Sequence, residues 1–333
     1  MPDSEKPDSD NPPASGNPLI STGLVLEESF LRHEIMPGHP ESPRRLEALA
    51  KKIRDTGLDR HTRAIKPLTD PLPWLDSIHS REHIEHIRRL PIAGNIAALA
   101  VSAALSAVDA VCRGEVGNAF CAVRPPGHHA HNLGYEEGFC YYNSIAVAAR
   151  YAQKVHGCGK VLIIDWDYHH GNGTEEAFYS DPSVLFFSTH KWRAYPVTGD
   201  PARKGRGEGL GYTLNVDLPA GTTDMDMLSA WDRELIPAAE KFKPDLVLIS
   251  AGFDARKDDT LGDFCITDDG FRRMTRQALA LAGLAGKGRV VSLLEGGYNP
   301  EGLAHGVAAH LEELLAAPRG VPAPGGLSAP KAG

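Results

Sequence analysis

The stretch Val161–Thr174, VLIIDWDYHHGNGT, joins a short apolar run to a run of acidic, histidine and glycine residues. Its first part, Val161–Ile164, shows no alternation of apolar and polar side chains, which is typical of a strand that is covered on both faces. Because side chains alternate across a strand, Asp165, Asp167 and His169 lie on one side as this strand ends. The segment therefore predicts a buried strand with polar, reactive side chains at its carboxyl end.

The same pattern recurs along the chain, with helical patterns between the apolar runs. The further runs are Ala119–Val123, Val184–Phe187, Leu246–Ile249 and Val290–Leu294. The expected helices extend from Ser42 to Gly57, Asn95 to Gly114, Asn143 to Gly157, Asp224 to Lys241 and Thr267 to Leu281. An antiparallel α+β sheet would need hairpin turns between neighbouring strands, and few are found. The alternation predicts an α/β fold: a single domain with a doubly wound, mostly parallel sheet.

The composition excludes several classes of protein. Hydrophobic residues make up 42% and charged residues 23% of the 333 residues, as in an ordinary globular protein. The formal net charge is −8 and no basic run occurs, so no nucleic-acid partner is expected. No stretch approaches the ~20 uninterrupted apolar residues of a membrane span, so no membrane partner is expected either.

The ends of the chain and the cysteines add three expectations. Residues 1–18 and 318–333 are rich in proline and in small or polar residues, which predicts disordered tails around one domain at 19–317. Met1–Asp10 lacks the apolar core of a secretory signal. The five cysteines are odd in number and show no CxxC spacing, which fits a reducing cytoplasm rather than a disulfide scaffold.

Four of the predicted strands lead directly into unusual polar segments. These segments are RPPGHHA at 124–130, DWDYHHGNGT at 165–174, SAGFDA at 250–255 and EGGYN at 295–299. In open parallel sheets, ligands bind in the crevice outside the carboxyl ends of the strands. We therefore expect the four segments to gather around one site.

A metal ion is the first ligand that these segments predict. Asp167 and His169 can offer a carboxylate oxygen and an imidazole nitrogen to one cation, and Asp254 is a third candidate from another strand end. A catalytic zinc typically takes three protein ligands and keeps one position for water. Fe(II) or Co(II) can compete for an oxygen-rich set of this kind. A single D-x-H arises often by chance, but the second Asp and the two histidine doublets favour a metal site.

The remaining polar residues supply proton transfer and hydrogen-bond donors. The doublet His128-His129 follows Pro-Pro-Gly, and imidazole is the natural proton shuttle near neutral pH. Asp165 and Asn172 are candidate orienting partners for these two rings. Tyr298 follows two glycines and can donate a hydrogen bond to an oxyanion beside the metal. Together these groups predict the hydrolysis of a carbonyl compound by metal-activated water.

These motifs, with GFCYYN at 138–143 and HEIMPGHPESPRRL from His33, resemble the signature set of the zinc-dependent histone deacetylase family. That family includes acetylpolyamine amidohydrolases and bacterial deacetylase-like amidohydrolases. The resemblance extends from about His33 to about Leu315, and the HHGNGT, GFDA and EGGYN forms are similar to the class II and bacterial branch. It implies the arginase/deacetylase fold and one catalytic zinc ion.

The resemblance also implies a role for each matching residue. The zinc ligands would be Asp167, His169 and Asp254. His129 would be the general base and acid, with Asn172 as its neighbour. His128 would be the electrostatic partner, paired with Asp165. Tyr298 would donate to the oxyanion, and a tyrosine there predicts an active deacetylase, because branches with histidine at this place deacetylate poorly.

Substrate and potassium sites follow from the same resemblance. The walls of an acyl-lysine tunnel would be Gly138, Phe139, Tyr195 and Gly297. One structural potassium ion would be held by Asp165, the backbone of Asp167 and His169, Ser188 and Thr189. A second would use the carbonyl groups of Phe178, Asp181, Val184 and Tyr212.

The chain departs from the family at the rim of the expected site. The connection Leu90–Gly94, between a helix near His79–Arg89 and the next one, is short, and no Asp or Glu occurs between Glu85 and Asp109. Relatives often carry a longer loop here, with an acidic residue that grips the substrate backbone. The segment Ala255–Asp259 also differs from the usual one, which alters the charge of the rim.

The sequence thus predicts removal of acetyl, or other acyl, groups from Nε-acyl-lysine in proteins or peptides. The alternative substrate is an acetylpolyamine or another small acetylated amine, although the insertion that guards such sites in relatives is not found. A binuclear manganese ureohydrolase would need more Asp ligands than DWDYHH and Asp254 provide. A non-catalytic reader of acylated proteins would be expected to lack Tyr298 or a metal ligand, and all of these are present.

Overall fold

The computed structural model describes residues 22–317, so both predicted tails lie outside the described residues. Eight parallel strands form one sheet in the order β2-β1-β3-β8-β7-β4-β5-β6. The strands are β1 (Thr22–Val25), β2 (Arg63–Ala64), β3 (Asn118–Cys121), β4 (Val161–Asp165), β5 (Val184–Lys191), β6 (Thr213–Leu218), β7 (Leu246–Ala251) and β8 (Val290–Leu294). The five predicted runs are all strands, and the mostly parallel sheet that was expected is parallel throughout.

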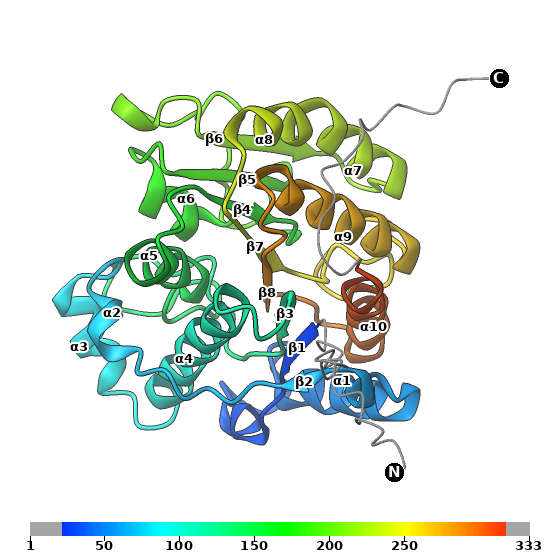
Figure 1. Cartoon of the computed structure of the whole chain (residues 1–333). Coiled ribbons are helices and arrows are strands. Elements are labelled where there is room, and N and C mark those ends of the chain that lie inside the picture. Colours follow the sequence, from blue (N-terminus) through cyan, green and yellow to red (C-terminus); the bar gives the residue numbers. More distant parts are fainter. Residues whose placement is uncertain (1–21, 318–333) are drawn as a thin grey trace, which may run out of the picture.

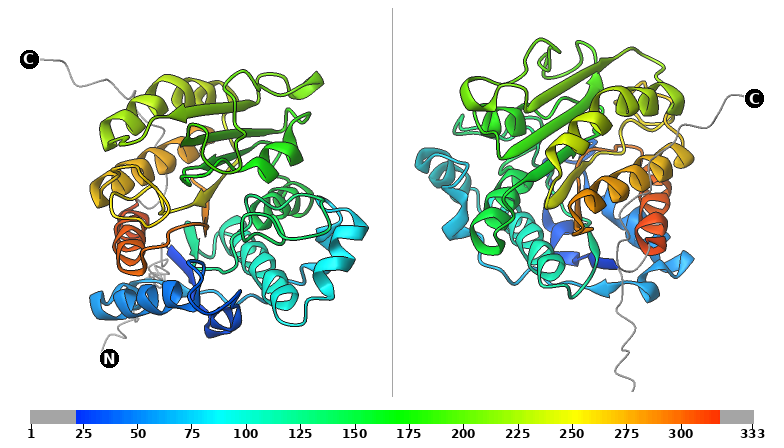
Figure 2. Two further views of the ribbon diagram at one scale, coloured as in Figure 1. Left: turned by 180° about the vertical axis from the view of Figure 1, so that it is seen from behind. Right: turned by 45° about the horizontal axis from the view of Figure 1, so that its top comes forward.

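Helices cover both faces of this sheet, which confirms the doubly wound fold (Figure 1; Figure 2). Helices α4 and α5 pack together on one face, and α1, α10, α9 and α7 pack in a row on the other. The helices are α1 (Pro43–Thr56), α2 (Leu72–Leu75), α3 (Arg81–Arg88), α4 (Ala93–Cys112), α5 (Ser144–His156), α6 (Asn172–Phe178), α7 (Asp224–Ala230), α8 (Ile236–Phe242), α9 (Asp268–Ala282) and α10 (Pro300–Ala316).

The expected helix from Asp224 to Lys241 is not continuous. A π-helical turn, Trp231–Leu235, separates α7 from α8. Pro237 follows this turn and has no backbone N–H to donate to the preceding turn, so the regular α-helical bonding is interrupted there. By contrast, α1 starts at Pro43 and stops at Gly57, which has a left-handed φ of 69°, as the sequence predicts.

Helix α4 has 20 residues and is long and apolar enough, by length and composition, to cross a membrane. It is the one such helix among residues 22–317, and 78% of its most apolar window is buried inside the fold. It packs against β1, β3 and β8, and it confirms the helix expected at Asn95–Gly114. The five cysteines, all within the described residues, are free thiols.

The parallel order brings the polar segments together. The carboxyl ends of β3, β8, β7 and β4, which are consecutive neighbours, all lie at one edge of the sheet. The register places Asp165 at the end of β4 between Ser250 of β7 and Ser188 of β5. The four segments that follow these strands therefore meet above the centre of the sheet.

Candidate metal centre and active site

Three side chains from two strand ends converge on a single point. Asp167 and His169 follow β4, and Asp254 follows β7. The Nδ1 atom of His169 lies 3.1 Å from Oδ1 of Asp167 and 3.0 Å from Oδ2 of Asp254. One ligand atom from each residue lies within 4.8 Å of the other two, and both carboxylates are fully buried. The structure thus brings together the three residues that the sequence proposes as metal ligands.

The electrostatics of this group fit a single divalent cation. Burial and the charge of Asp167 together raise the pKa of Asp254 to about 7. Burial opposes the charged form of His169, but its hydrogen bonds to Asp167 and Asp254 outweigh that effect and raise its pKa to about 10. Two buried carboxylates around one imidazole nitrogen are costly without a cation and make a suitable donor set for one.

Two glycines allow the backbone to approach these ligands closely. A Cβ atom added at Gly252 would lie 2.1 Å from Oδ2 of Asp167, and one at Gly296 would lie 2.1 Å from Oδ2 of Asp254. Any larger residue at either position would displace a carboxylate. This packing gives a physical reason for glycine in the SAGFDA and EGGYN segments.

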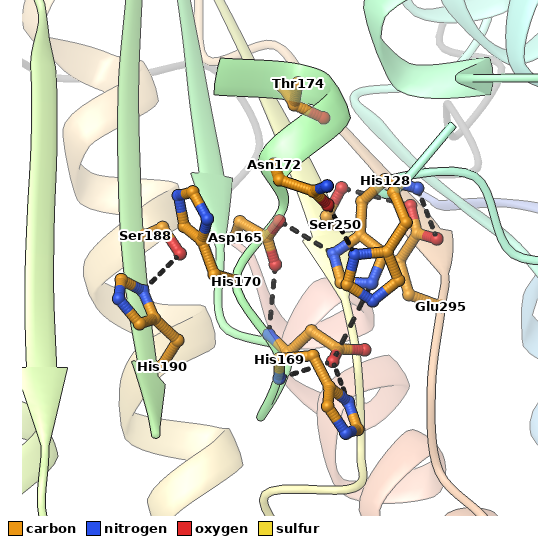
Figure 3. Close-up of polar contacts among 12 residues, drawn as sticks. His128, Asp165, His169, His170, Asn172, Thr174, Ser188, His190, Ser250 and Glu295 are labelled. Atoms are coloured by element: carbon orange, nitrogen blue, oxygen red, sulfur yellow. Dashed lines mark hydrogen bonds and ion pairs between the residues drawn. The ribbon is translucent and has the colours of Figure 1, made fainter. Parts of the chain in front are cut away.

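The histidine doublet lies beside the metal ligands: Nε2 of His128 is 3.8 Å from Oδ1 of Asp167, and Figure 3 labels His128 and the ligand His169. The His128 Nδ1 atom is 2.9 Å from Oδ2 of Asp165, and the His129 Nδ1 atom is 2.7 Å from Oδ1 of Asn172. The centroids of the two imidazole rings are 4.0 Å apart. Both orienting partners that the sequence proposes are therefore in place.

The two rings differ in their proton affinity. Burial alone would lower the pKa of His128, but the charges of Asp165 and Asp167 outweigh it and raise that pKa well above its ordinary value. Burial, helped by His128 and His169, holds the pKa of His129 well below its ordinary value. His128 is therefore the charged ring and His129 the neutral one, and a neutral imidazole can accept a proton.

Glu295 supports the backbone of the loop that carries the histidine doublet, a role that the sequence did not indicate. Its Oε2 atom accepts the backbone N–H of Gly127 at 2.6 Å and that of His128 at 3.2 Å. Its Oε1 atom accepts the hydroxyl of Ser250 at 3.1 Å. Glu295 is a potential metal ligand with His128 and Cys140, but both of its oxygens already accept hydrogen bonds. We therefore interpret it as a support for the loop.

Tyr298 is buried, and its loop is held by two side chains that the sequence did not single out. Oδ2 of Asp259 accepts the backbone N–H of Tyr298 at 2.6 Å. Arg45 donates from Nε to the Gly297 carbonyl and from Nη2 to the Glu295 carbonyl, each at 2.5 Å, and its guanidinium lies 5.1 Å from the centre of the Tyr298 ring. Burial and the nearby carboxylates raise the pKa of Tyr298 well above its usual range, so the phenol keeps its proton for donation.

Two aromatic rings flank the histidines and the tyrosine. The Phe139 ring centroid is 6.0 Å from that of Tyr298, and the half-exposed Tyr195 ring is 5.1 Å from that of His129. Phe139 follows Gly138 in a tight turn where both have positive φ, 69° and 54°. The turn places Gly138 so close to His129 that an added Cβ would lie 2.3 Å from Cδ2 of the ring. Three of the four predicted tunnel residues thus border the histidines or the tyrosine through space, and the fourth, Gly297, directly precedes Tyr298 in the chain.

The residues predicted to hold potassium lie in two places. Ser188 pairs with Asp165 in the β4–β5 register, next to the metal ligands, and the buried hydroxyl of Thr189 has no hydrogen-bond partner among residues 22–317. The second set lies at the end of α6, in the turn to β5, at the start of β5, and just before β6; its members are Phe178, Asp181, Val184 and Tyr212. The potassium assignments stay predictions.

The fold and the site define a class of parallel α/β proteins in which two carboxylates and an imidazole meet beside two histidines and a tyrosine. Comparison with known proteins identifies the family. The Histone deacetylase domain profile matches residues 39–314. A probable deacetylase of Archaeoglobus fulgidus is 38% identical over 297 residues, covering 84% of this chain and 82% of that protein. This chain therefore belongs to the histone deacetylase family, and it is a hydrolytic deacetylase.

Further relatives agree with this assignment. Histone deacetylase 5 of Arabidopsis thaliana is 35% identical over 334 residues, covering 90% of this chain and 50% of that protein. Histone deacetylase 6 of Caenorhabditis elegans is 37% identical over 311 residues, but the match spans only 32% of that longer protein. A crystal structure of the HDA15 HD domain superposes with a TM-score of 0.82 at 35% identity, covering 89% of this chain and 88% of that one.

Proposed function

We propose that this deacetylase is zinc-dependent and removes acetyl groups from Nε-acetyl-lysine in proteins or peptides. One observation supports the metal chemistry above all others: Asp167, His169 and Asp254 direct their ligand atoms at one buried point, and the His129 ring centroid lies 6.0 Å from that of His169. Two oxygen ligands and one nitrogen ligand leave room for water and substrate in a catalytic zinc site. When bound, a zinc ion lowers the pKa of its water and polarises the substrate carbonyl.

The protein's own groups have separate tasks in this proposal. His129 is neutral, so it accepts the proton of the attacking water and later donates it to the leaving lysine amine. Asp165 keeps the His128 ring protonated. The positive charge of that ring stabilises the negative charge that develops on the substrate carbonyl oxygen. Tyr298 keeps its phenolic proton and donates a hydrogen bond to the same oxygen.

The proposed substrate follows from the walls of the site. Phe139 and Tyr195 approach the catalytic side chains from two different loops, and such aromatic faces suit the aliphatic stem of an acyl-lysine. The relatives named histone deacetylase support the same substrate class. Small acetylated amines are the competing substrates, because the short Leu90–Gly94 connection supplies no acidic side chain for a peptide backbone.

The test is activity measured side by side on an acetyl-lysine peptide and on acetylputrescine, with zinc content determined on the same sample. We expect about one zinc ion per chain and faster turnover of the peptide. Faster turnover of acetylputrescine would replace the proposed substrate and keep the chemistry. Metal-loaded protein that is inert on both would contradict the proposal.

A further inference from the structure

We propose that Glu137 is a positioning residue that acts through Asn172 to set which nitrogen of His129 carries the proton. The inference rests on the proposed function of the same site. It concerns a residue that none of the sequence motifs singled out. Glu137 touches neither His129 nor the metal ligands, and its effect passes through the side-chain amide of Asn172.

The contacts form a chain of three side chains. Oε1 of Glu137 accepts a hydrogen bond from Nδ2 of Asn172 at 3.0 Å. Oδ1 of the same amide is 2.7 Å from Nδ1 of His129. Asn172 is buried, and it begins helix α6 directly after the loop that leaves β4 (Figure 3). The amide therefore has a fixed partner on each side.

A carboxylate accepts hydrogen bonds and cannot donate them, whereas an amide can present either its oxygen or its NH2 group. Glu137 therefore requires the NH2 group of Asn172 to face it, which turns the amide oxygen toward His129. The His129 ring must then donate an N–H from Nδ1 to this oxygen, which leaves the lone pair of the neutral imidazole at Nε2. Without Glu137 the amide can rotate by half a turn and stabilise the opposite tautomer, which cannot accept a proton at Nε2.

The main chain keeps Glu137 in place. Its N–H donates to the carbonyl of Cys140 at 3.0 Å, and the N–H of Cys140 donates back at 2.9 Å. This closed turn contains Gly138, which packs against the His129 ring. The second carboxylate oxygen, Oε2, is buried and has no hydrogen-bond partner among the described residues. The turn thus directs the Glu137 carboxylate at Asn172, and the same turn packs against the His129 ring.

The experiment exchanges the carboxylate of Glu137 and the amide of Asn172, the two groups of the hydrogen-bond relay to His129. Glu137→Gln removes the strict acceptor, so we expect turnover to fall by about tenfold, with KM unchanged. Asn172→Asp places two carboxylates in contact and should also lower turnover. In the double variant Glu137→Gln/Asn172→Asp, the Asp accepts from His129 and the Gln donates to the Asp. We expect the double variant to regain most of the lost turnover. Glu136→Gln, at the exposed neighbouring acid, is the matched control and should keep wild-type turnover.

A second measurement reads the tautomer without turnover. In protein labelled with ¹⁵N-histidine, the two ring nitrogens of His129 should report a proton at Nδ1 in the wild type and a mixture of tautomers in Glu137→Gln. Three results would each overturn the inference. The first is unchanged nitrogen shifts and turnover in Glu137→Gln, and the second is a change in KM alone. The third is a loss of turnover in the double variant that equals the sum of the two single losses. If the wild type does not hydrolyse acetyl-lysine, the proposed function fails, while the nitrogen shifts still decide whether the relay exists.

Discussion

Replacing Asp259 with Asn tests how the loop that carries Tyr298 is held. One carboxylate oxygen accepts the backbone N–H of Tyr298 at 2.6 Å and that of Asn299 at 3.1 Å. The other accepts those of Leu261 and Gly262 at 2.9 Å and 3.3 Å. An Asn amide has only one oxygen, so one pair of N–H groups would face an NH2 group.

The size of the effect follows from those contacts. A hydrogen bond to a charged group contributes about 1.5–3 kcal/mol, and Asp259 is partly exposed, so we take the lower value for each bond. Losing one pair then costs about 3 kcal/mol, which corresponds to a factor of roughly 100 in the population of the held loop. Removing an oxyanion donor altogether lowers turnover by about 10²–10³-fold. We therefore expect Asp259→Asn to lower turnover by about 10- to 100-fold.

The assay compares acetyl-lysine with trifluoroacetyl-lysine in the same peptide. Fluorine stabilises the developing oxyanion, so the fluorinated substrate depends less on the Tyr298 hydrogen bond. We expect Asp259→Asn to lose much more activity on acetyl-lysine than on trifluoroacetyl-lysine. The control is Asp258→Asn, because that exposed carboxylate pairs with Arg256 and not with the Tyr298 loop. Equal losses on both substrates, or no loss on either, would refute the positioning role of Asp259.

Three further predictions concern other parts of the protein. Tyr298→Phe should keep its zinc and lose about 10²–10³-fold in turnover, since only the phenolic donor is removed; unchanged turnover would argue against its role. Asp254→Ala should fold, as judged by circular dichroism, but lose its zinc; a folded variant with one zinc per chain would show that Asp254 is not a ligand. Burial lowers the pKa of His33 to about 4 and of His79 and His310 to about 3. At these three histidines the unfolded chain therefore binds more protons than the folded one below about pH 6.5. The stability that they contribute is complete above that pH, and together they lose about 4 kcal/mol per pH unit as the solution is acidified from about pH 6 toward pH 4. Urea midpoints measured between pH 7.5 and pH 5 check this, and a flat profile would contradict it.

The central strands could be predicted because they are buried on both faces. Runs such as Val161–Ile164 and Leu246–Ile249 lack any alternation, which is typical of strands in the middle of a parallel sheet. The strands toward the two edges were missed for physical reasons. β2 has only two residues, β1 has four, and β6 includes the polar residues Thr213, Asn215 and Asp217, so none has a strong apolar run.

The candidate site divides in the same way. Asp167, His169 and Asp254 could be predicted to meet because each directly follows a strand in one parallel sheet. Glu137, Asp259 and other supporting residues such as Glu295 could not, because their roles depend on which backbone N–H groups or amides the tertiary fold brings to them. The sequence of a loop does not predict which hydrogen-bond donors its carboxylates will contact in the folded chain.

Anomalous X-ray scattering at the zinc edge, measured on crystals grown with zinc, locates the metal ion directly. We predict one strong peak per chain between the carboxylates of Asp167 and Asp254 and the Nδ1 atom of His169. A peak at the neighbouring group of His128, Cys140 and Glu295 instead, or no peak in active protein, would contradict it.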